Sequence, residues 1–250
     1  EILYGESRLR LYLPSEKALL LEPLGIEQLV LVPFDLALAS LSAKEFFHQI
    51  LINNLQAKQI AVGANFRFGK NREGDTSTLK TLGKEANVEI SIVEIIEDNQ
   101  GRMSSSRIRS ALKEGDLEIT NNLLGRPYTF RGNVVRGKGL GKKIGWPTAN
   151  LQVDVHKLLP GQGVYAVLAK RTNDKDYFPA VMNLGLQPTV SAEAPSAIEV
   201  HILNQEVDLE NTELVIKPIK RIRATKKFPS LTALSEQIKL DSEKAISILS

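Results

Sequence analysis

The feature that most constrains this chain is a glycine-rich, basic stretch, Arg136–Asn150, which reads RGKGLGKKIGWPTAN. Its four glycines, Gly137, Gly139, Gly141 and Gly145, remove Cβ atoms, so the chain can bend tightly and turn backbone N–H groups toward a ligand. Four cations and no acid lie in the same stretch, namely Arg136, Lys138, Lys142 and Lys143. This charge predicts an anionic ligand such as an oligophosphate.

The end of the stretch predicts a metal site. Pro147 biases Trp146 toward an extended conformation and begins a predicted strand. Thr148 and Asn150 follow two residues apart, a spacing that places both side chains on one face of a strand. Their hydroxyl and carboxamide oxygens are hard ligands of the kind that Mg²⁺ accepts while keeping most of its waters.

The stretch differs from a Walker loop. Gly132–Lys138 has the spacing GxxxxGK, but Gly139 follows instead of Ser or Thr, and no helix-forming run comes next. A glycine-rich basic loop alone is equally typical of a solvated hairpin. Together with Pro-Thr-Ala-Asn, however, it resembles riboflavin kinase. The resemblance implies that Thr148 and Asn150 bind Mg²⁺ and that ATP is bound by Gly137, Lys138, Gly139, Gly141, Lys142, Gly145 and Pro147.

Short strand patterns separated by Gly, Pro and Asn turns fill the second half of the chain. They run over residues 128–136, 163–171, 177–184, 197–203 and 213–222, which favours a small closed antiparallel barrel. Two helical patterns follow, at 230–239 and 241–248. We expect these helices to pack over the barrel.

One of these strands carries a candidate general base. In Ile198–Ile202 the isoleucines and valine alternate with Glu199 and His201, so the acid and the histidine face away from the core. A carboxylate within reach of a primary alcohol can accept its proton, although an exposed strand carboxylate is more often plain surface. The resemblance to riboflavin kinase implies that Glu199 is the catalytic base. It also implies flavin-side roles for Asn183, in an Asn-x-Gly-x-x-Pro-Thr segment, and for Arg223. The alternative for Arg223 is a solvated basic strand end, together with Lys220, Arg221, Lys226 and Lys227.

The first half of the chain alternates helix and strand patterns. We expect helices at 15–24, from Ser42 and after Asp75, and strands at 27–33, 59–63 and 88–96. Ser42 and Glu45 have the spacing of a capping box. Strands separated by helices predict a Rossmann-type parallel sheet, whose ligands lie at the carboxyl ends of the strands.

Two loops in this half have binding character. In the first, Asn65 could hydrogen-bond a planar ring, Phe66 could stack on one and Arg67 could meet phosphate; the alternative is core packing with a solvated arginine. In the second, hydroxyls at a helix start beside arginines suit an anion, and the alternative is ordinary capping by Ser104. This second set comprises Ser104, Ser105, Ser106, Arg107 and Arg109.

The two loops resemble motifs of FMN adenylyltransferase in bacterial bifunctional FAD synthetases, in the same order ahead of a riboflavin kinase half. The resemblance implies a nucleotidyltransferase-like domain at 1–125 and a kinase barrel at 126–250. It also implies a His-x-Gly-His motif on an early turn, and none of the three histidines, His48, His156 and His201, lies in such a pattern. We expect that an upstream segment carrying it is missing from this sequence.

Composition narrows the function class. The formal net charge is +3 and there is no cysteine, which favours a globular protein with a local basic site and argues against thiolate chemistry. No apolar run approaches the roughly 20 residues of a membrane span. We therefore expect a cytoplasmic protein without nucleic-acid or membrane partners. The resemblance implies an enzyme that uses riboflavin, FMN, FAD and ATP/ADP, and self-association stays open.

Two competing interpretations remain. The barrel could instead be an oligonucleotide-binding module, with residues 131–143 as a basic groove and Trp146 as a stacking platform. The amino-terminal domain could be retained only as a scaffold.

Overall fold

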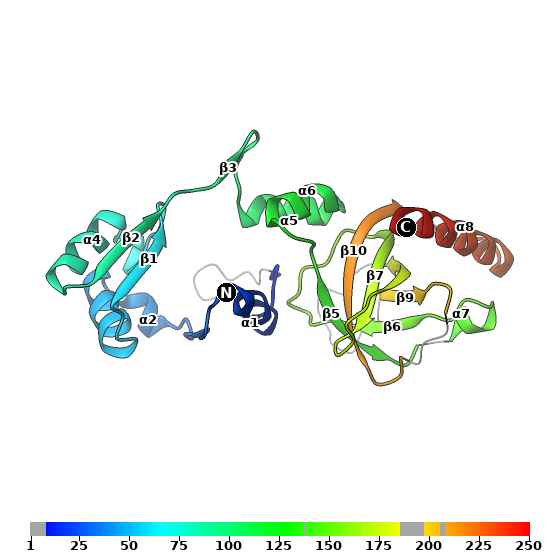
Figure 1. Cartoon of the computed structure of the whole chain (residues 1–250), viewed down its shortest axis with the longest axis horizontal. Coiled ribbons are helices and arrows are strands. Elements are labelled where there is room, and N and C mark those ends of the chain that lie inside the picture. The colour runs from blue at the N-terminus through cyan, green and yellow to red at the C-terminus, as the bar shows by residue number, and fades with distance from the viewer. Residues whose placement is uncertain (1–8, 138, 186–197, 206–208) are drawn as a thin grey trace. The chain divides into compact units, whose positions relative to one another are not determined.

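The computed structural model describes residues 9–137, 139–185, 198–205 and 209–250 (Figure 1). They form two compact units, one within Ile26–Met103 and one that combines the described residues up to Gly25 with Ser104–Ser250. The second unit is therefore discontinuous in sequence. This division by packing differs from the predicted sequence division at 125/126, which stays a prediction.

The first unit is a small α/β structure. β1 (Gln59–Gly63) and β2 (Glu89–Val93) pair in parallel, as the alternating pattern predicted. The remaining elements are α2 (Leu36–Ser40), α3 (Ala43–Glu45), the π-helix Phe46–Asn54, the 3₁₀ turn Lys70–Arg72, α4 (Thr76–Glu85), β3 (Glu97–Asp98) and β4 (Gly101–Arg102).

Local capping signals predicted two helix starts of this unit correctly, whereas α2, capped by Asp35, was not predicted. Ser42 accepts the Glu45 N–H through its hydroxyl, and the Glu45 carboxylate accepts the Ser42 N–H at 2.8 Å, a complete capping box. Asp75 accepts the Thr78 N–H at 2.9 Å and begins α4. Beyond them, Phe47 is fully buried in a core shared with Phe68, Leu79 and Leu82.

The strand predicted at 27–33 is wrong. The segment has no regular secondary structure, and Leu31 and Val32 are 62% and 47% exposed. Its apolar composition suits a buried strand, but a strand also needs neighbouring backbone groups to pair with. Among the described residues β1 and β2 pair with each other, and residues 27–33 pair with neither.

The second unit contains the predicted barrel, which is closed with the strand order β10-β5-β6-β9-β8-β7. The strands are β5 (Phe130–Val135), β6 (Ala149–Gln152), β7 (Gly163–Arg171), β8 (Phe178–Leu184), β9 (Ile198–Ile202) and β10 (Glu213–Arg223). The helices are α1 (Pro14–Leu21), the 3₁₀ turn Glu22–Leu24, α5 (Ser105–Glu114), α6 (Leu117–Leu124), α7 (Leu140–Lys143) and α8 (Leu231–Leu249).

α8 covers part of the outer face of the barrel (Figure 1). Ala245 of α8 packs against Val164, Ala166 and Val181 of β7 and β8, while Ile246, Ile248 and Leu249 extend the cluster. The inward-facing side chains of the same strands, among them Tyr165 and Met182, are fully buried. Two residue layers therefore fix the strands, one inside the barrel and one beneath α8.

α8 is a single helix, whereas the sequence predicted two helices that break near residue 240. Asp241 was expected to begin the second helix, because aspartate is a common N-cap. Instead its buried carboxylate accepts hydrogen bonds from Arg223 and from the Gln237 carboxamide. With its side chain used in this way, Asp241 continues the helix and does not cap one.

A buried lysine connects residues 9–25, which belong to the second unit but precede the first in sequence, to the barrel. Lys157 is fully buried and its Nζ donates to Leu11 O at 2.8 Å, to Glu16 Oε2 at 2.7 Å and to Thr129 O at 3.1 Å. Nζ also lies 4.6 Å from the ring centre of Tyr12. This network ties α1 to the barrel.

The network predicts how stability varies with pH. Burial lowers the pKa of Lys157 to about 8 in spite of the neighbouring Glu16 carboxylate. Above that pH the unfolded chain binds more protons at this lysine than the folded chain, so the free energy of unfolding rises with pH, by up to about 1.4 kcal/mol per unit. Above about pH 10 the raised pKa values of Tyr12 and Tyr128 act in the opposite direction.

Denaturant unfolding at pH 7.5, 8.5 and 9.5 checks this expectation. The chain has one tryptophan, Trp146 in the second unit, and its fluorescence reports unfolding of that unit. The rise in unfolding free energy is expected to disappear in Lys157→Met and to persist in the control Lys175→Met, since Lys175 is exposed. Parallel pH profiles for the native chain and Lys157→Met would rule out the lysine as the source.

Candidate active site

The glycine-rich stretch forms a tight turn that encloses a short helix. The sequence predicted no helix here, yet α7 makes one turn over Leu140–Lys143. A Cβ on Gly137 would lie 1.9 Å from Asn150 Nδ2, and one on Gly141 would lie 2.3 Å from Trp146 O. Real Cβ atoms do not approach other atoms so closely, so these two glycines let the turn pack directly on residues 146–150.

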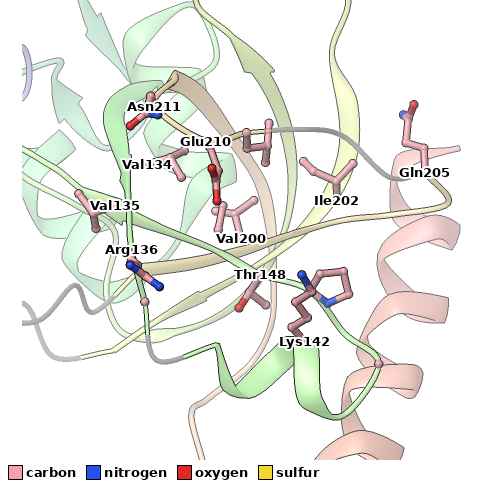
Figure 2. Close-up of a pocket in the computed structure, with 15 residues that line it drawn as sticks. Val134, Val135, Arg136, Lys142, Thr148, Val200, Ile202, Gln205, Glu210 and Asn211 are labelled. Atoms are coloured by element: carbon pink, nitrogen blue, oxygen red, sulfur yellow. The ribbon is translucent and has the colours of Figure 1, made fainter.

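The turn lines a cavity of about 920 Å³ (Figure 2). Arg136, at the end of β5, and Lys142, in α7, line it together with the hydroxyl-bearing Thr148. The predicted nucleotide-binding residues Gly137, Gly145 and Pro147 also line it, whereas Lys138 lies outside the described residues. Gly139 begins α7 at a φ of +66°, and Gly141 touches Thr148.

The opposite wall of the cavity was missed by sequence reasoning. It is formed by apolar side chains of β9, Val200 and Ile202, and by residues before β10. The latter are Gln205, Leu209, Glu210 and Asn211. Asn211 has a φ of +55°, typical of a turn asparagine, and this turn preference was the only local signal for that wall.

Three polar residues lie in a row across neighbouring strands of the barrel, on the face opposite to that of the cavity-lining Val200 and Ile202. In the barrel register Glu199 of β9 is opposite Asn150 of β6 on one side and Asn183 of β8 on the other. Directly opposite residues in antiparallel strands share a face, with Cβ atoms roughly 4.5–5.5 Å apart. The predicted alternation is confirmed: Ile198, Val200 and Ile202 are buried and Glu199 is exposed. The predicted metal ligand, base and flavin-side residue are therefore neighbours.

Arg223 lies at the end of β10, opposite Val164, which is itself opposite Asn183. Its guanidinium makes a two-pronged contact with Asp241 of α8, with Nε–Oδ1 at 2.9 Å and Nη2–Oδ2 at 2.6 Å. The ring of Phe228 lies 5.7 Å from the guanidinium carbon. The charge is thus fixed by α8 and not solvated at a strand end.

The first predicted loop, which contains Asn65, Phe66 and Arg67, follows β1 directly in the first unit. The carboxamide oxygen of Asn65, turned toward Arg102, accepts from both Nη atoms at 2.8 Å. Phe66 stacks on Phe68 with ring centres 5.4 Å apart, and Phe68 is core. Arg67 pairs with Asp75 at 3.1 Å.

The second predicted loop begins α5 in the second unit and follows the β3–β4 hairpin, not β2. Ser104 is its N-cap and accepts the Arg107 N–H at 3.4 Å. Ser105 and Ser106 are exposed in the first turn. Within the described part of the chain, Nε of Arg109 is buried without a hydrogen-bond partner. Capping by Ser104, the ordinary role, is thus present, and ligand roles for this set stay predictions.

Comparison with known proteins assigns the two halves. The riboflavin kinase family model matches residues 124–249, and the FAD synthetase family model matches residues 2–107. The bifunctional riboflavin kinase/FMN adenylyltransferase of Escherichia coli (strain K12) is 37% identical over 226 residues, which cover 90% of this chain and 71% of that protein. The protein of the same name from Bacillus subtilis (strain 168) is 36% identical and covers 90% and 71%.

A solved structure shares the fold. A Streptococcus pneumoniae protein described as a macrolide-efflux protein superposes with a TM-score of 0.83 at 33% identity, over 95% of this chain and 75% of that chain. Among the residues with described positions here, no helix has the length and apolar character to cross a membrane. The two family models and the curated relatives agree with each other and with the barrel, and on this evidence the chain belongs to the bifunctional riboflavin kinase/FMN adenylyltransferase family.

Proposed function

We propose that the barrel transfers the γ-phosphoryl group of ATP to the terminal ribityl hydroxyl of riboflavin, giving FMN, and that the amino-terminal half belongs to the activity that adenylylates FMN to FAD. The observation that carries the kinase assignment is the row of Asn150, Glu199 and Asn183, in which Asn150 lies against Gly137 of the glycine-rich turn. Family membership supports both activities. A cytoplasmic location stays a prediction.

Phosphoryl transfer depends on the positioning of the reactants and on neutralisation of the phosphate charge more than on covalent catalysis. In the proposed site the backbone N–H groups of the turn, with Arg136 and Lys142, hold the phosphates. Glu199 accepts the proton of the attacking hydroxyl. Asn183 and Arg223 lie farther along the same row of paired residues and hold the flavin side.

Thr148 and Asn150 fit a magnesium ion. Thr148 lines the cavity, and the missing Cβ of Gly137 leaves room for the Asn150 carboxamide against the turn. The described residues contain no cluster of three or more His, Cys, Asp or Glu side chains, so a bound metal would have few protein ligands. Mg²⁺ accepts such sites because it keeps several waters. When bound it would neutralise charge on the phosphate oxygens.

Incubation of the chain with riboflavin, Mg²⁺ and ATP, followed by chromatography of the flavins, tests the proposal. FMN as product supports the kinase assignment, and FAD in addition supports adenylylation by the same chain. FMN without FAD would leave the adenylylation proposal without support for this chain, and unchanged riboflavin would contradict the kinase assignment.

Thr148→Ala is expected to weaken the dependence of the kinase on magnesium. The loss of one oxygen ligand should raise the Mg²⁺ concentration for half-maximal rate by roughly tenfold. The control Thr172→Ala lies at the far end of β7, beside Glu213. A magnesium titration identical to that of the native chain would remove Thr148 from the metal site.

A further inference from the structure

Residues of β9, of the turn at 146–147 and of α8 contact one another next to the proposed metal site. His201 of β9 lies with Nδ1 2.7 Å from the Pro147 carbonyl oxygen. Its ring meets the edge of Trp146, with ring centres 5.3 Å apart and planes at 80°. Trp146 Nε1 in turn donates to Ser235 Oγ of α8 at 2.9 Å. The turn at 146–147 is therefore held between β9 and α8.

The hydrogen bond from His201 has a defined direction. A carbonyl oxygen only accepts, so Nδ1 must carry the proton. The imidazolium and the neutral Nδ1–H tautomer both meet this requirement. The contact can therefore persist whether or not the ring is charged.

The position of the Pro147 carbonyl matters for the residue that follows. The carbonyl of Pro147 and the amide nitrogen of Thr148 belong to one planar peptide unit. A group that fixes this oxygen also fixes the plane from which the Thr148 side chain projects. On the other side of the turn, Trp146 N–H donates to Gly141 O at 2.8 Å, which holds the peptide unit between Gly145 and Trp146.

We propose that His201 is a positioning residue for the magnesium and phosphate site, acting through the Pro147 carbonyl. This inference rests on the proposed roles of Thr148 and Asn150. β9 then has two functions on one face: Glu199 takes the proton, and His201, two residues later, sets the turn that holds the metal ligands. The same contacts hold the indole of Trp146 between β9 and α8.

Two variants of similar size separate the hydrogen bond from packing. In His201→Asn the carboxamide nitrogen can occupy the place of Nδ1 and still donate, whereas His201→Leu fills similar space without a donor. Both lose the imidazole ring that meets Trp146. The control is His156→Gln, because the His156 side chain is exposed.

The expected result is a difference between the two variants. His201→Leu raises the Mg²⁺ concentration for half-maximal phosphorylation by roughly tenfold, the size of one lost hydrogen bond. The KM for riboflavin stays within about twofold, as expected for a metal-site effect. In His201→Asn both values stay within about threefold of the native chain. Equal behaviour of the two variants, whether both normal or both impaired, would overturn the proposal.

Tryptophan fluorescence tests the contact without nucleotide or metal. Trp146 is the only tryptophan, so its emission reports this turn alone. His201→Leu should shift the emission to longer wavelength and increase quenching by acrylamide more than His201→Asn does, because only the asparagine keeps a donor for the Pro147 carbonyl. Ser235→Ala, which removes the indole acceptor on the α8 side, should give the same shift. If His201→Leu does not fold, His201→Phe, which has a ring but no donor, replaces it in both measurements.

The outcomes distinguish this inference from the proposed function. A fluorescence change in His201→Leu with an unchanged magnesium titration would overturn the positioning role, even if Thr148→Ala showed the expected metal effect. If Thr148→Ala left the magnesium titration unaltered, the assignment of Thr148 to the metal site would be wrong. The fluorescence of Trp146 would then still show whether His201 holds the turn.

Discussion

Glu199→Gln is expected to lower riboflavin phosphorylation by roughly two to four orders of magnitude, the usual loss when a general base is removed. The carboxamide keeps the size of the side chain and its place between Asn150 and Asn183, but it cannot accept the proton of the hydroxyl. Affinities for ADP and riboflavin should therefore stay within about twofold, because uniform binding is untouched. Single-turnover rates with calorimetric titrations of both ligands measure the two effects separately.

The matched control is Glu236→Gln, which makes the same substitution at an exposed position of α8. It should leave turnover unchanged. Normal turnover in Glu199→Gln would eliminate Glu199 as the base and leave it as a surface carboxylate. Equal losses in turnover and in ligand affinity would point to a disturbed site and not to a missing base.

Gly137→Ala is expected to reduce kinase activity by roughly 10²-fold, because displacements of about 1 Å in a reacting site have effects of that size. The added methyl group would lie 1.9 Å from Asn150 Nδ2. Either the turn or the carboxamide must move, and both belong to the proposed phosphate and metal site. The loss in the free energy of unfolding should be smaller than the loss in transition-state stabilisation that the activity reports, since Gly137 is exposed.

A double-mutant cycle with Asn150→Ala shows whether the clash is the cause. Asn150→Ala alone should also lose roughly 10²-fold, through the lost ligand. If the alanine at 137 acts only by pushing the carboxamide, the double variant should be no worse than Asn150→Ala. Additive losses of roughly 10⁴-fold would show that Gly137 has an independent role in the turn.

Local chemistry made much of the fold predictable. N-caps at Ser42 and Asp75 depend on residues within three positions, and each begins a helix as expected. The alternation in Ile198–Ile202 gave the buried and exposed faces of β9 correctly. Together with glycine-rich turns, this pattern was enough to predict the barrel.

The wrong predictions concern segments whose structure depends on residues far away in the sequence. Residues 27–33 have strand composition but do not pair with any of the described strands. Asp241 has capping chemistry, yet Arg223 from another element takes its carboxylate. α7 forms in a stretch whose glycines disfavour helices, because it needs only one turn.

Half of the candidate site could be predicted and half could not. The glycine-rich turn, Thr148 and Asn150 are close in sequence, so their spacing indicated a common site. The facing wall, with Gln205 and Glu210, comes from the connection before β10 and meets the turn only through barrel closure. No periodicity in the sequence specifies that meeting.

A crystal structure of the chain with ADP, Mg²⁺ and riboflavin tests the central claim most directly. We predict the diphosphate on the glycine-rich turn between Arg136 and Lys142, the metal at Thr148 and Asn150, and the ribityl terminal hydroxyl within hydrogen-bond reach of Glu199. A nucleotide bound outside this cavity, or a hydroxyl far from Glu199, would contradict the account.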